Sequence, residues 1–234
     1  MDRTMINQNV LNVSTSERAE FIRKTYMHLA LAILGFVALE YVLLQQVWIT
    51  NLIDMMTGGM NWLIVMGAFM LIGWIADKWA RSSVSKSIQY IGLFLYVIAE
   101  AFIFIPLLYF AMYYTSPDVI PTAGMITGLL FIGLTFIVFT TNKDFSFLGS
   151  ILKIAFFVAL GIIIASVIFG FTIGLLFSAI MVILASASIL YTTSQIQRHY
   201  STEQYVAASL SLFASVALLF WYVLRIVISI FGND

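Results

Sequence analysis

The stretch from Lys143 to Arg198, KDFSFLGSILKIAFFVALGIIIASVIFGFTIGLLFSAIMVILASASILYTTSQIQR, decides the fold of this chain. It contains two apolar runs, Leu148–Phe169 and Ile173–Ile196, with only a very short connection between them. Each run has about the 20 residues that a helix needs to cross the ~30 Å hydrocarbon core of a bilayer. No charged residue lies between Lys153 and Arg198. The pattern predicts a transmembrane hairpin of two antiparallel helices.

The rest of the chain repeats the same pattern. We predict further spans at Met27–Val47, Asn61–Trp79, Ile88–Tyr114, Thr122–Thr141 and Tyr205–Phe231. Helices satisfy their backbone groups within such segments, and the alternating pattern that a membrane barrel requires is missing. With 62% hydrophobic and only 9% charged residues, the chain is suited to lipid as its solvent. The sequence therefore predicts an all-α polytopic membrane protein, a seven-transmembrane-helix bundle.

The basic residues predict the orientation of this bundle. Ten of the eleven fall in alternate polar segments: Arg3, Arg18, Arg23 and Lys24, then Lys78, Arg81 and Lys86, then Lys143 and Lys153, then Arg198. Segments rich in Lys and Arg remain in the cytoplasm. We therefore predict that the N-terminus lies inside and the C-terminus outside.

Two regions follow from this assignment. Residues 1–25 are expected to form a cytoplasmic N-terminal tail with an amphipathic lead-in, and residues 26–234 a single seven-helix transmembrane domain. The tail lacks the short apolar core and cleavage site of a signal peptide. Ser14 and Glu17 have the spacing of a helix N-terminus, with a hydroxyl followed three residues later by a carboxylate.

Glu100 is the ionisable residue placed deepest in the predicted membrane. It lies about twelve residues into the third span, or about 18 Å from its start at about 1.5 Å per residue, which is near the midplane. Pro106 follows and removes a backbone donor from the helix. A carboxyl group there is a candidate proton or cation site. The alternative is a neutral carboxyl group that only forms a hydrogen bond to a neighbouring helix.

Two other charged residues lie in the outer part of the predicted membrane. Glu40 is in the first span and Arg225 in the last. We consider them a candidate structural ion pair, because each would neutralise the other. The alternative for Arg225 is that its long side chain extends to the outer headgroups.

Small residues indicate where helices pack closely. Gly124 and Gly128 form a small-xxx-small pattern, and Gly161 with Ala165 forms another. We expect close helix contacts at both. The span Ile173–Ile196 is so rich in Ala, Ser and Thr that we expect it to be the central helix.

Several common catalytic motifs are missing from the sequence. It has no Cys, and it lacks the HExxH, GxSxG and phosphate-binding glycine-loop patterns. We expect no catalytic residues, no bound metal, no cofactor and no nucleic-acid partner. The expected surroundings are the lipid bilayer.

Four segments resemble the Bax inhibitor-1 family of seven-helix membrane proteins, and within it the bacterial YccA-like branch. They are Phe21–Ile33 (FIRKTYMHLALAI), Lys143–Gly149 (KDFSFLG), Ile189–Ile196 (ILYTTSQI) and Ser209–Gly232 (SLSLFASVALLFWYVLRIVISIFG). The resemblance implies a location in the bacterial inner membrane and two functional alternatives. One is modulation of the membrane AAA protease FtsH, with the N-terminal tail as a handle. The other is a pH-sensitive leak in which calcium or protons are the permeants.

The chain departs from the family at the residues that the leak would use. The resemblance implies an Asp where this chain has Thr192 and another where it has Ser215. A hydroxyl group does not titrate near neutral pH. Glu100, Thr192 and Ser215 remain the candidate residues of an ion or proton pathway. We favour protease modulation, and transport of a small solute is a third alternative that rests on Glu100 and Pro106.

Overall fold

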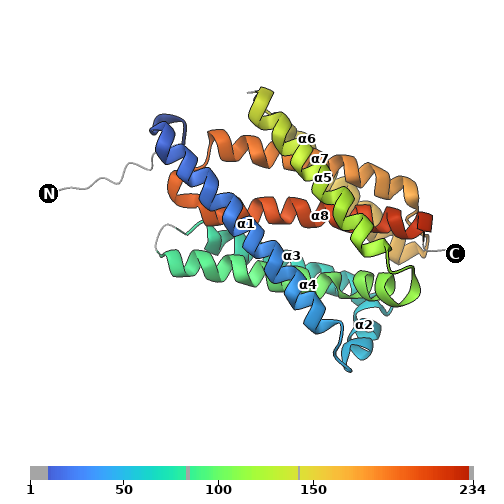
Figure 1. Ribbon diagram of the computed structural model, residues 1–234. Helices are drawn as coiled ribbons and strands as arrows, with labels where there is room; N and C mark the ends of the chain where they lie inside the picture. Colours follow the sequence, from blue (N-terminus) through green and yellow to red (C-terminus); the bar gives the residue numbers. More distant parts are fainter. Residues whose placement is uncertain (1–9, 83–84, 142, 232–234) are drawn as a thin grey trace.

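Seven long helices form the bundle. A computed structural model describes residues 10–82, 85–141 and 143–231. The long helices are α1 (Thr15–Leu43), α3 (Asn61–Ala80), α4 (Lys86–Tyr114), α5 (Val119–Thr141), α6 (Leu148–Phe169), α7 (Leu175–Arg198) and α8 (Tyr205–Phe231) (Figure 1). All seven are long and apolar enough to cross a membrane. The predicted seven-helix bundle is confirmed.

Three short helical segments were not predicted. They are η1 (Val10–Asn12), α2 (Ile49–Thr57) and η2 (Thr202–Gln204). The helix α2 lies in the connection between α1 and α3, and its Ile49 and Met56 side chains are buried. Because a nine-residue helix is too short to span lipid, α2 leaves the number of crossings unchanged.

The first helix begins earlier than the apolar pattern indicated. Ser14 is its N-cap, and the Ser14 side chain accepts a hydrogen bond from the Glu17 backbone while the Glu17 side chain accepts one from the Ser14 backbone. The predicted helix start at these two residues is confirmed. Since α1 runs from Thr15 without a break, the amphipathic lead-in is the first part of the first membrane helix.

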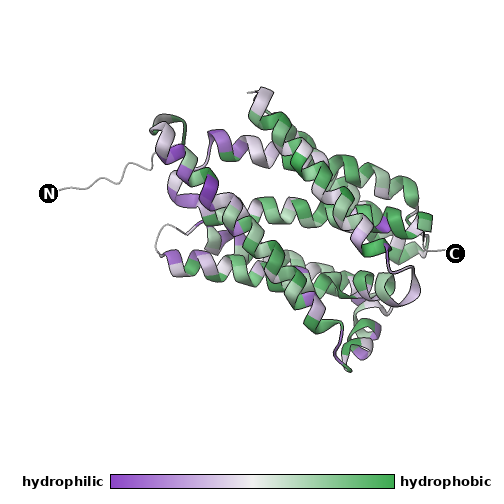
Figure 2. Cartoon of the chain, viewed as in Figure 1, coloured by the Kyte–Doolittle hydropathy of each residue, from purple (hydrophilic) through white to green (hydrophobic). Residues whose placement is uncertain are grey.

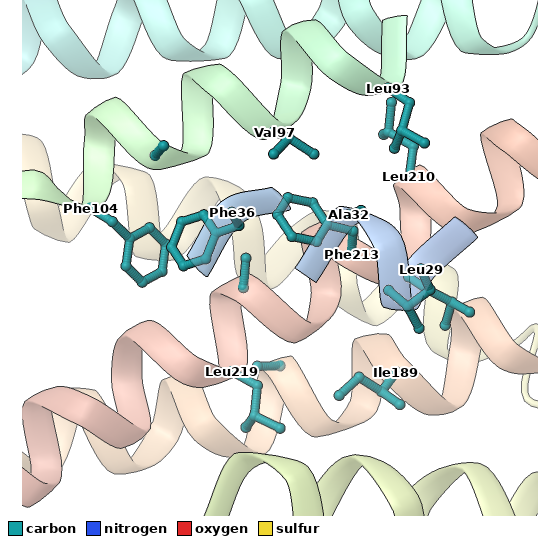
Figure 3. Packing of buried hydrophobic residues seen from close by; sticks show 14 of the residues in the cluster. Leu29, Ala32, Phe36, Leu93, Val97, Phe104, Ile189, Leu210, Phe213 and Leu219 are labelled. Atoms are coloured by element: carbon teal, nitrogen blue, oxygen red, sulfur yellow. The ribbon is translucent and has the colours of Figure 1, made fainter. Parts of the chain in front are cut away.

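The core surrounds α8, which packs against α1, α3, α4, α5 and α7. Figure 3 shows the rings of Phe36, Phe104 and Phe213 meeting between α1, α4 and α8. The Phe36 ring centroid is 5.1 Å from that of Phe104 and 6.1 Å from that of Phe213. The helix α7, which we expected to be central, packs against α5, α6 and α8. Its Leu176 and Ile183 side chains are exposed, however, and α8 is the more central helix.

The bundle has two ends with different chemistry. The end that carries the start of α1 and the α3–α4, α5–α6 and α7–α8 connections is called the N-terminal face here, and the opposite end the C-terminal face. Figure 2 shows that hydrophilic residues gather toward the N-terminal face. Lys86 forms an ion pair of 2.7 Å with Glu203 there, joining two of the basic segments. The alternating basic residues therefore meet at one end, as a single cytoplasmic face requires.

The chain is anchored to this face from Val10 onward. Val10 is fully buried, and its N–H donates to the carbonyl of Tyr200 at 3.1 Å. The tail as a whole is therefore not a free handle. The remaining tail residues, 1–9, lie outside the described residues.

Of the described glycines, the one with the tightest surroundings was not singled out by the sequence patterns. A Cβ atom at Gly92 on α4 would be 2.5 Å from the carbonyl oxygen of Ala76 on α3. By contrast, a Cβ at Gly124, Gly128 or Gly161 would meet no atom within 4 Å. The predicted close contacts at Gly124, Gly128 and Gly161 are wrong within this chain, because those glycines lie on faces that no neighbouring helix covers.

Candidate functional site

A cavity of about 540 Å³ lies beside α8, with walls from α3, α4, α6, α7 and α8. Most of its lining is aliphatic or aromatic. Its lining residues with hydroxyl or charged groups are Tyr96, Glu100, Ser166, Ser188, Ser215, Tyr222 and Arg225. A largely apolar pocket with a few convergent polar groups is the usual form of a ligand site. This cavity is therefore the candidate functional site.

Glu100 lies on the α4 wall of the cavity. The residue is only 6% exposed, and Tyr96, one helical turn away on α4, lines the same cavity. The helix α4 continues through Pro106. Of the three predicted pathway residues, Glu100 and Ser215 line the cavity directly.

Hydroxyl groups meet at the interface of α7 and α8. The Ser215 oxygen is 3.0 Å from that of Ser188 and 3.4 Å from that of Thr192. Ser215 also donates to the carbonyl of Ser211 at 3.0 Å. Thr192 and Ser215 thus face each other, as their positions on the two predicted helices implied. Ser188 completes the group and was not a predicted site residue.

A second group of polar side chains continues from Ser211 to the N-terminal face. The Ser211 oxygen is 3.0 Å from the hydroxyl of Tyr200. Arg81 donates to Tyr200 at 3.2 Å and to Ser211 at 3.3 Å, and it forms an ion pair of 2.8 Å with Asp77. From the sequence, Arg81 was expected only to mark the cytoplasmic side of the membrane. The spacing of Asp77 and Arg81, which puts them on one helix face, was the available signal.

The expected ion pair between Glu40 and Arg225 is not formed. The Arg225 guanidinium donates to the carbonyl of Ile173 at 3.1 Å. Glu40 is 5% exposed, and neither of its carboxyl oxygens has a hydrogen-bond partner among the described residues. The two residues project from different sides of their helices. Glu40 shares the face of α1 that buries Phe36, whereas Arg225 faces the cavity.

The arrangement suits proton chemistry better than calcium binding. In the described ranges, no group of three or more His, Cys, Asp or Glu side chains is placed to hold a metal ion. Calcium takes about six to eight oxygen ligands, several of them usually carboxylates. One carboxyl group beside neutral hydroxyls can instead donate, accept and hold a proton.

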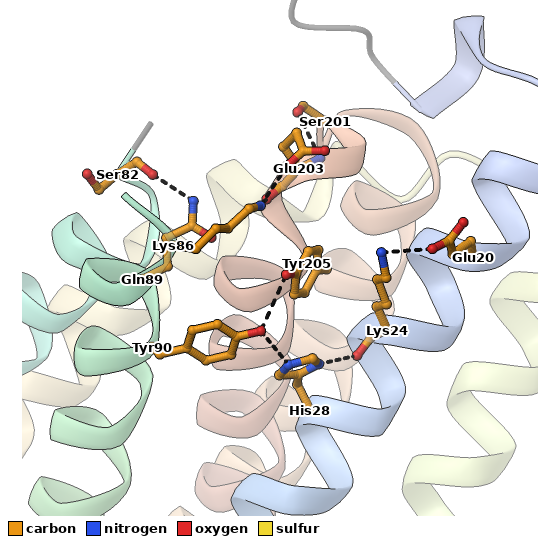
Figure 4. A network of polar contacts seen from close by, with 10 residues as sticks. All are labelled: Glu20, Lys24, His28, Ser82, Lys86, Gln89, Tyr90, Ser201, Glu203 and Tyr205. Atoms are coloured by element: carbon orange, nitrogen blue, oxygen red, sulfur yellow. Dashed lines mark hydrogen bonds and ion pairs between the residues drawn. The ribbon is translucent and has the colours of Figure 1, made fainter. Parts of the chain in front are cut away.

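A polar cluster at the N-terminal face joins three helices (Figure 4). His28 Nδ1 is 2.7 Å from the carbonyl of Lys24, and its Nε2 is 3.1 Å from the hydroxyl of Tyr90. Tyr90 reaches Tyr205 at 3.3 Å, so the contacts connect α1, α4 and α8. Because a carbonyl only accepts, Nδ1 carries a proton and donates to Lys24, and Nε2 forms the contact with the Tyr90 hydroxyl. Lys24 and Lys86 lie over the Tyr205 ring, 5.4 Å and 4.6 Å from its centroid.

The sequence of this chain matches a known protein family over most of its length. The family described as "Inhibitor of apoptosis-promoting Bax1" matches residues 18–233. An uncharacterised protein of Pseudomonas aeruginosa is 40% identical over 127 residues, which cover 53% of this chain and 56% of that protein. An uncharacterised membrane protein of Vibrio cholerae is 30% identical over 127 residues, covering 54% and 56%.

A third relative carries a functional name. "Modulator of FtsH protease YccA" of Escherichia coli is 34% identical over 110 residues, covering 47% of this chain and 50% of that protein. The matched segments thus span about half the length of each of these relatives. The family match extends over nearly all of the seven-helix bundle, and the chain is therefore a multi-pass membrane protein that belongs to the Bax inhibitor-1 family.

Proposed function

We propose that this protein is a partner and modulator of an FtsH-type AAA protease in the bacterial inner membrane. The observation that carries the proposal is the 34% identical segment shared with a protein named as a modulator of that protease. The role is in membrane protein quality control, and it requires contact with the protease rather than chemistry by this chain.

A AAA motor pulls a chain from an end. The first described residue, Val10, already forms a hydrogen bond with Tyr200 on the N-terminal face. We infer that residues 1–9 are the segment that the protease grips. The C-terminus follows α8 at the opposite face and provides a natural comparison.

The experiment compares two truncations in cells. Deletion of residues 2–9 should lengthen the lifetime of this protein and change the turnover of other protease substrates. Deletion of residues 232–234 is the matched control and should change neither. Both variants are checked for an intact bundle by size-exclusion chromatography and thermal unfolding. An unchanged lifetime after deletion of residues 2–9, together with no co-purification with the protease, contradicts the proposal.

A proton leak is the second candidate, and the placement of Glu100 favours it. Glu100 and Ser215 line the same cavity, and Ser215 is connected through Ser211 to Arg81 at the N-terminal face. Polar groups thus lead from the N-terminal face toward the cavity, and a proton would need water between Ser211 and Ser215, because Ser215 contacts the Ser211 carbonyl and not its hydroxyl. Calcium is the less suitable permeant, because the cavity lining contains only one carboxyl group, that of Glu100.

Flux measurements separate the two candidates. The purified protein in liposomes, with internal proton and calcium dyes, should pass neither ion if it acts only as a protease partner. Proton flux that depends on Glu100 supports the leak. Calcium flux through the unaltered protein would contradict our expectation that a cavity with a single carboxyl group does not conduct calcium.

A further inference from the structure

The cavity opens toward lipid between two helices that belong to different pairs. Its α3 wall packs mainly on α4, and its α6 wall packs mainly on α7. Met70 on α3 and Phe156 on α6 are 41% and 49% exposed and line the two sides. Since α3 and α6 have no extensive contact with each other among the described residues, nothing from the chain closes the space between them.

The interior of the cavity matches a hydrocarbon chain. Ser215 and Arg225 are ten positions apart on α8 and both line it, so it follows α8 for about 15 Å. Between them lie Ala217, Leu218 and Trp221, all of which line the cavity. The Trp221 ring stacks on that of Trp62 from α3, with centroids 6.4 Å apart. This long apolar lining provides few hydrogen-bonding groups for a polar solute.

One end of the cavity carries a cation that has no acidic partner among the described residues. The Arg225 guanidinium has one hydrogen bond, to the carbonyl of Ile173, and no carboxylate in the described ranges forms an ion pair with it. A guanidinium has five N–H donors and binds phosphate through two of them at once. Arg225 lies near the end of α8 at the C-terminal face, where the headgroups of one leaflet lie.

We propose that the cavity binds a membrane phospholipid, whose phosphate binds Arg225 and one of whose acyl chains lies along α8 between α3 and α6. The positive charge of Arg225 selects a phosphate over a cationic headgroup. Glu100, the acid in the cavity, lies on α4 with Tyr96 and too deep to meet a headgroup. The inference does not depend on protease modulation.

The bound chain has a consequence for the polar residues beside it. It fills the space next to Glu100, Ser188 and Ser215 and keeps water out of it. The series of polar contacts that leads from Arg81 through Ser211 to Ser215 therefore ends against hydrocarbon while the lipid is bound. Release of the lipid would be needed before water or ions reach Glu100.

Tryptophan fluorescence tests the proposal directly, because Trp221 lies on the central helix. The full chain with Trp48, Trp62, Trp74 and Trp79 replaced by Phe retains Trp221 as its fluorophore. It is reconstituted in vesicles of phospholipid with brominated or unbrominated acyl chains, since bromine quenches nearby indoles. We expect Trp221 to lose as much emission as a control that retains Trp74, which is 61% exposed toward lipid.

Variants separate recognition of the headgroup from simple filling of the space. In the Trp221 background, Arg225→Gln should restore most of the emission, Arg225→Lys should restore less, and Glu100→Gln should restore none. A Trp221 that is not quenched overturns the proposal. So does quenching that Arg225→Gln leaves unchanged, which would mean that any hydrocarbon fills the cavity. Recovery in Glu100→Gln instead would indicate a cationic ligand and would also overturn it.

A second measurement needs no change at Arg225, in case that variant does not fold. Brominated phospholipid and brominated diacylglycerol are each diluted to the same fraction in unbrominated phospholipid vesicles. The two carry the same chains, and only one has a phosphate. Stronger quenching of Trp221 by the phospholipid supports the site, and equal quenching overturns it.

Discussion

The hydroxyl oxygens of Ser188 and Ser215 are 3.0 Å apart across the interface of α7 and α8. Thr192, one turn further along α7, is 3.4 Å from the same Ser215 oxygen. Two carboxyl groups at positions 192 and 215 would therefore be close enough to share a proton. A close acid pair of this kind titrates in two steps, with one pKa strongly raised.

The double variant Thr192→Asp, Ser215→Asp should create or increase pH-dependent calcium flux in liposomes. Its two acids would supply the charge and titration that hydroxyl groups lack. The matched control, Thr192→Asn with Ser215→Asn, has the same shape without the charge and should show no such flux. Unchanged flux in a well-folded double Asp variant would count against a leak mechanism shared with relatives that carry acids there.

Glu100→Gln should leave the thermal stability in detergent nearly unchanged and abolish any proton flux. Glutamine has the same shape and keeps a polar group at this position, so we expect a change in unfolding free energy of no more than about 1 kcal/mol. A large loss of stability would show instead that an ionised Glu100 is held by a basic partner. Arg225, which lines the same cavity, would be the first residue to test for that role.

Gly92→Ala should destabilise the contact between α3 and α4. The added Cβ would lie 2.5 Å from the Ala76 oxygen and 3.0 Å from the Trp79 Cβ, and backbone must move to relieve the first contact. Overpacking of this kind costs about 1–3 kcal/mol. Gly128→Ala is the control, since its Cβ meets nothing within 4 Å. Equal unfolding midpoints for the two variants in detergent would contradict the close approach of α3 and α4.

Reporter fusions should show that the N-terminal face is cytoplasmic. Fusions after Asp144 and Ser201 should report inside, and those after Met56 and Ser116 outside, because the Lys and Arg residues gather at one face. A fusion at the C-terminus should also report outside. A cytoplasmic signal there would rule out seven crossings with the N-terminus inside.

Shortening the N-terminus should have a sharp limit at Val10. Deletion of residues 2–9 should leave the unfolding midpoint unchanged, whereas deletion of residues 2–13 removes Val10, which is fully buried. Loss of a buried aliphatic side chain costs about 2–5 kcal/mol for the larger ones, and somewhat less is expected for a valine. Equal midpoints for the two deletions would mean that the Val10 contact with Tyr200 contributes nothing to stability.

The depth of residues in the membrane could be predicted from the sequence, but their direction around the helix axis could not. Thr192 and Ser215 were expected to face each other because their helices are consecutive and their depths agree. Glu40 and Arg225 also agree in depth, yet they project from different sides of α1 and α8. A uniformly apolar helix shows little periodicity, so its buried face is not visible in the sequence.

The glycines and Arg81 were misjudged for related reasons. A small-xxx-small pattern shows that a close approach is possible, but it does not show that a partner is present. Gly124 and Gly128 have the pattern without a partner, and Gly92 has the partner without the pattern. Arg81 belongs to a connection whose basic residues first indicate topology. Its contacts with Tyr200 and Ser211 depend on the fold of residues far along the chain.

The central position of α8 has a consequence for how the protein is made. Chains fold from the N-terminus during synthesis, and α8 is the last helix to leave the ribosome. Until then, α1, α4, α5 and α7 lack the surface against which their buried residues pack. Every nascent chain therefore passes through a stage in which six membrane helices are inserted but α8, on which most of them pack, is not yet in place. A chain that stops before α8 remains in that state and exposes to the membrane the surfaces that quality-control machinery recognises.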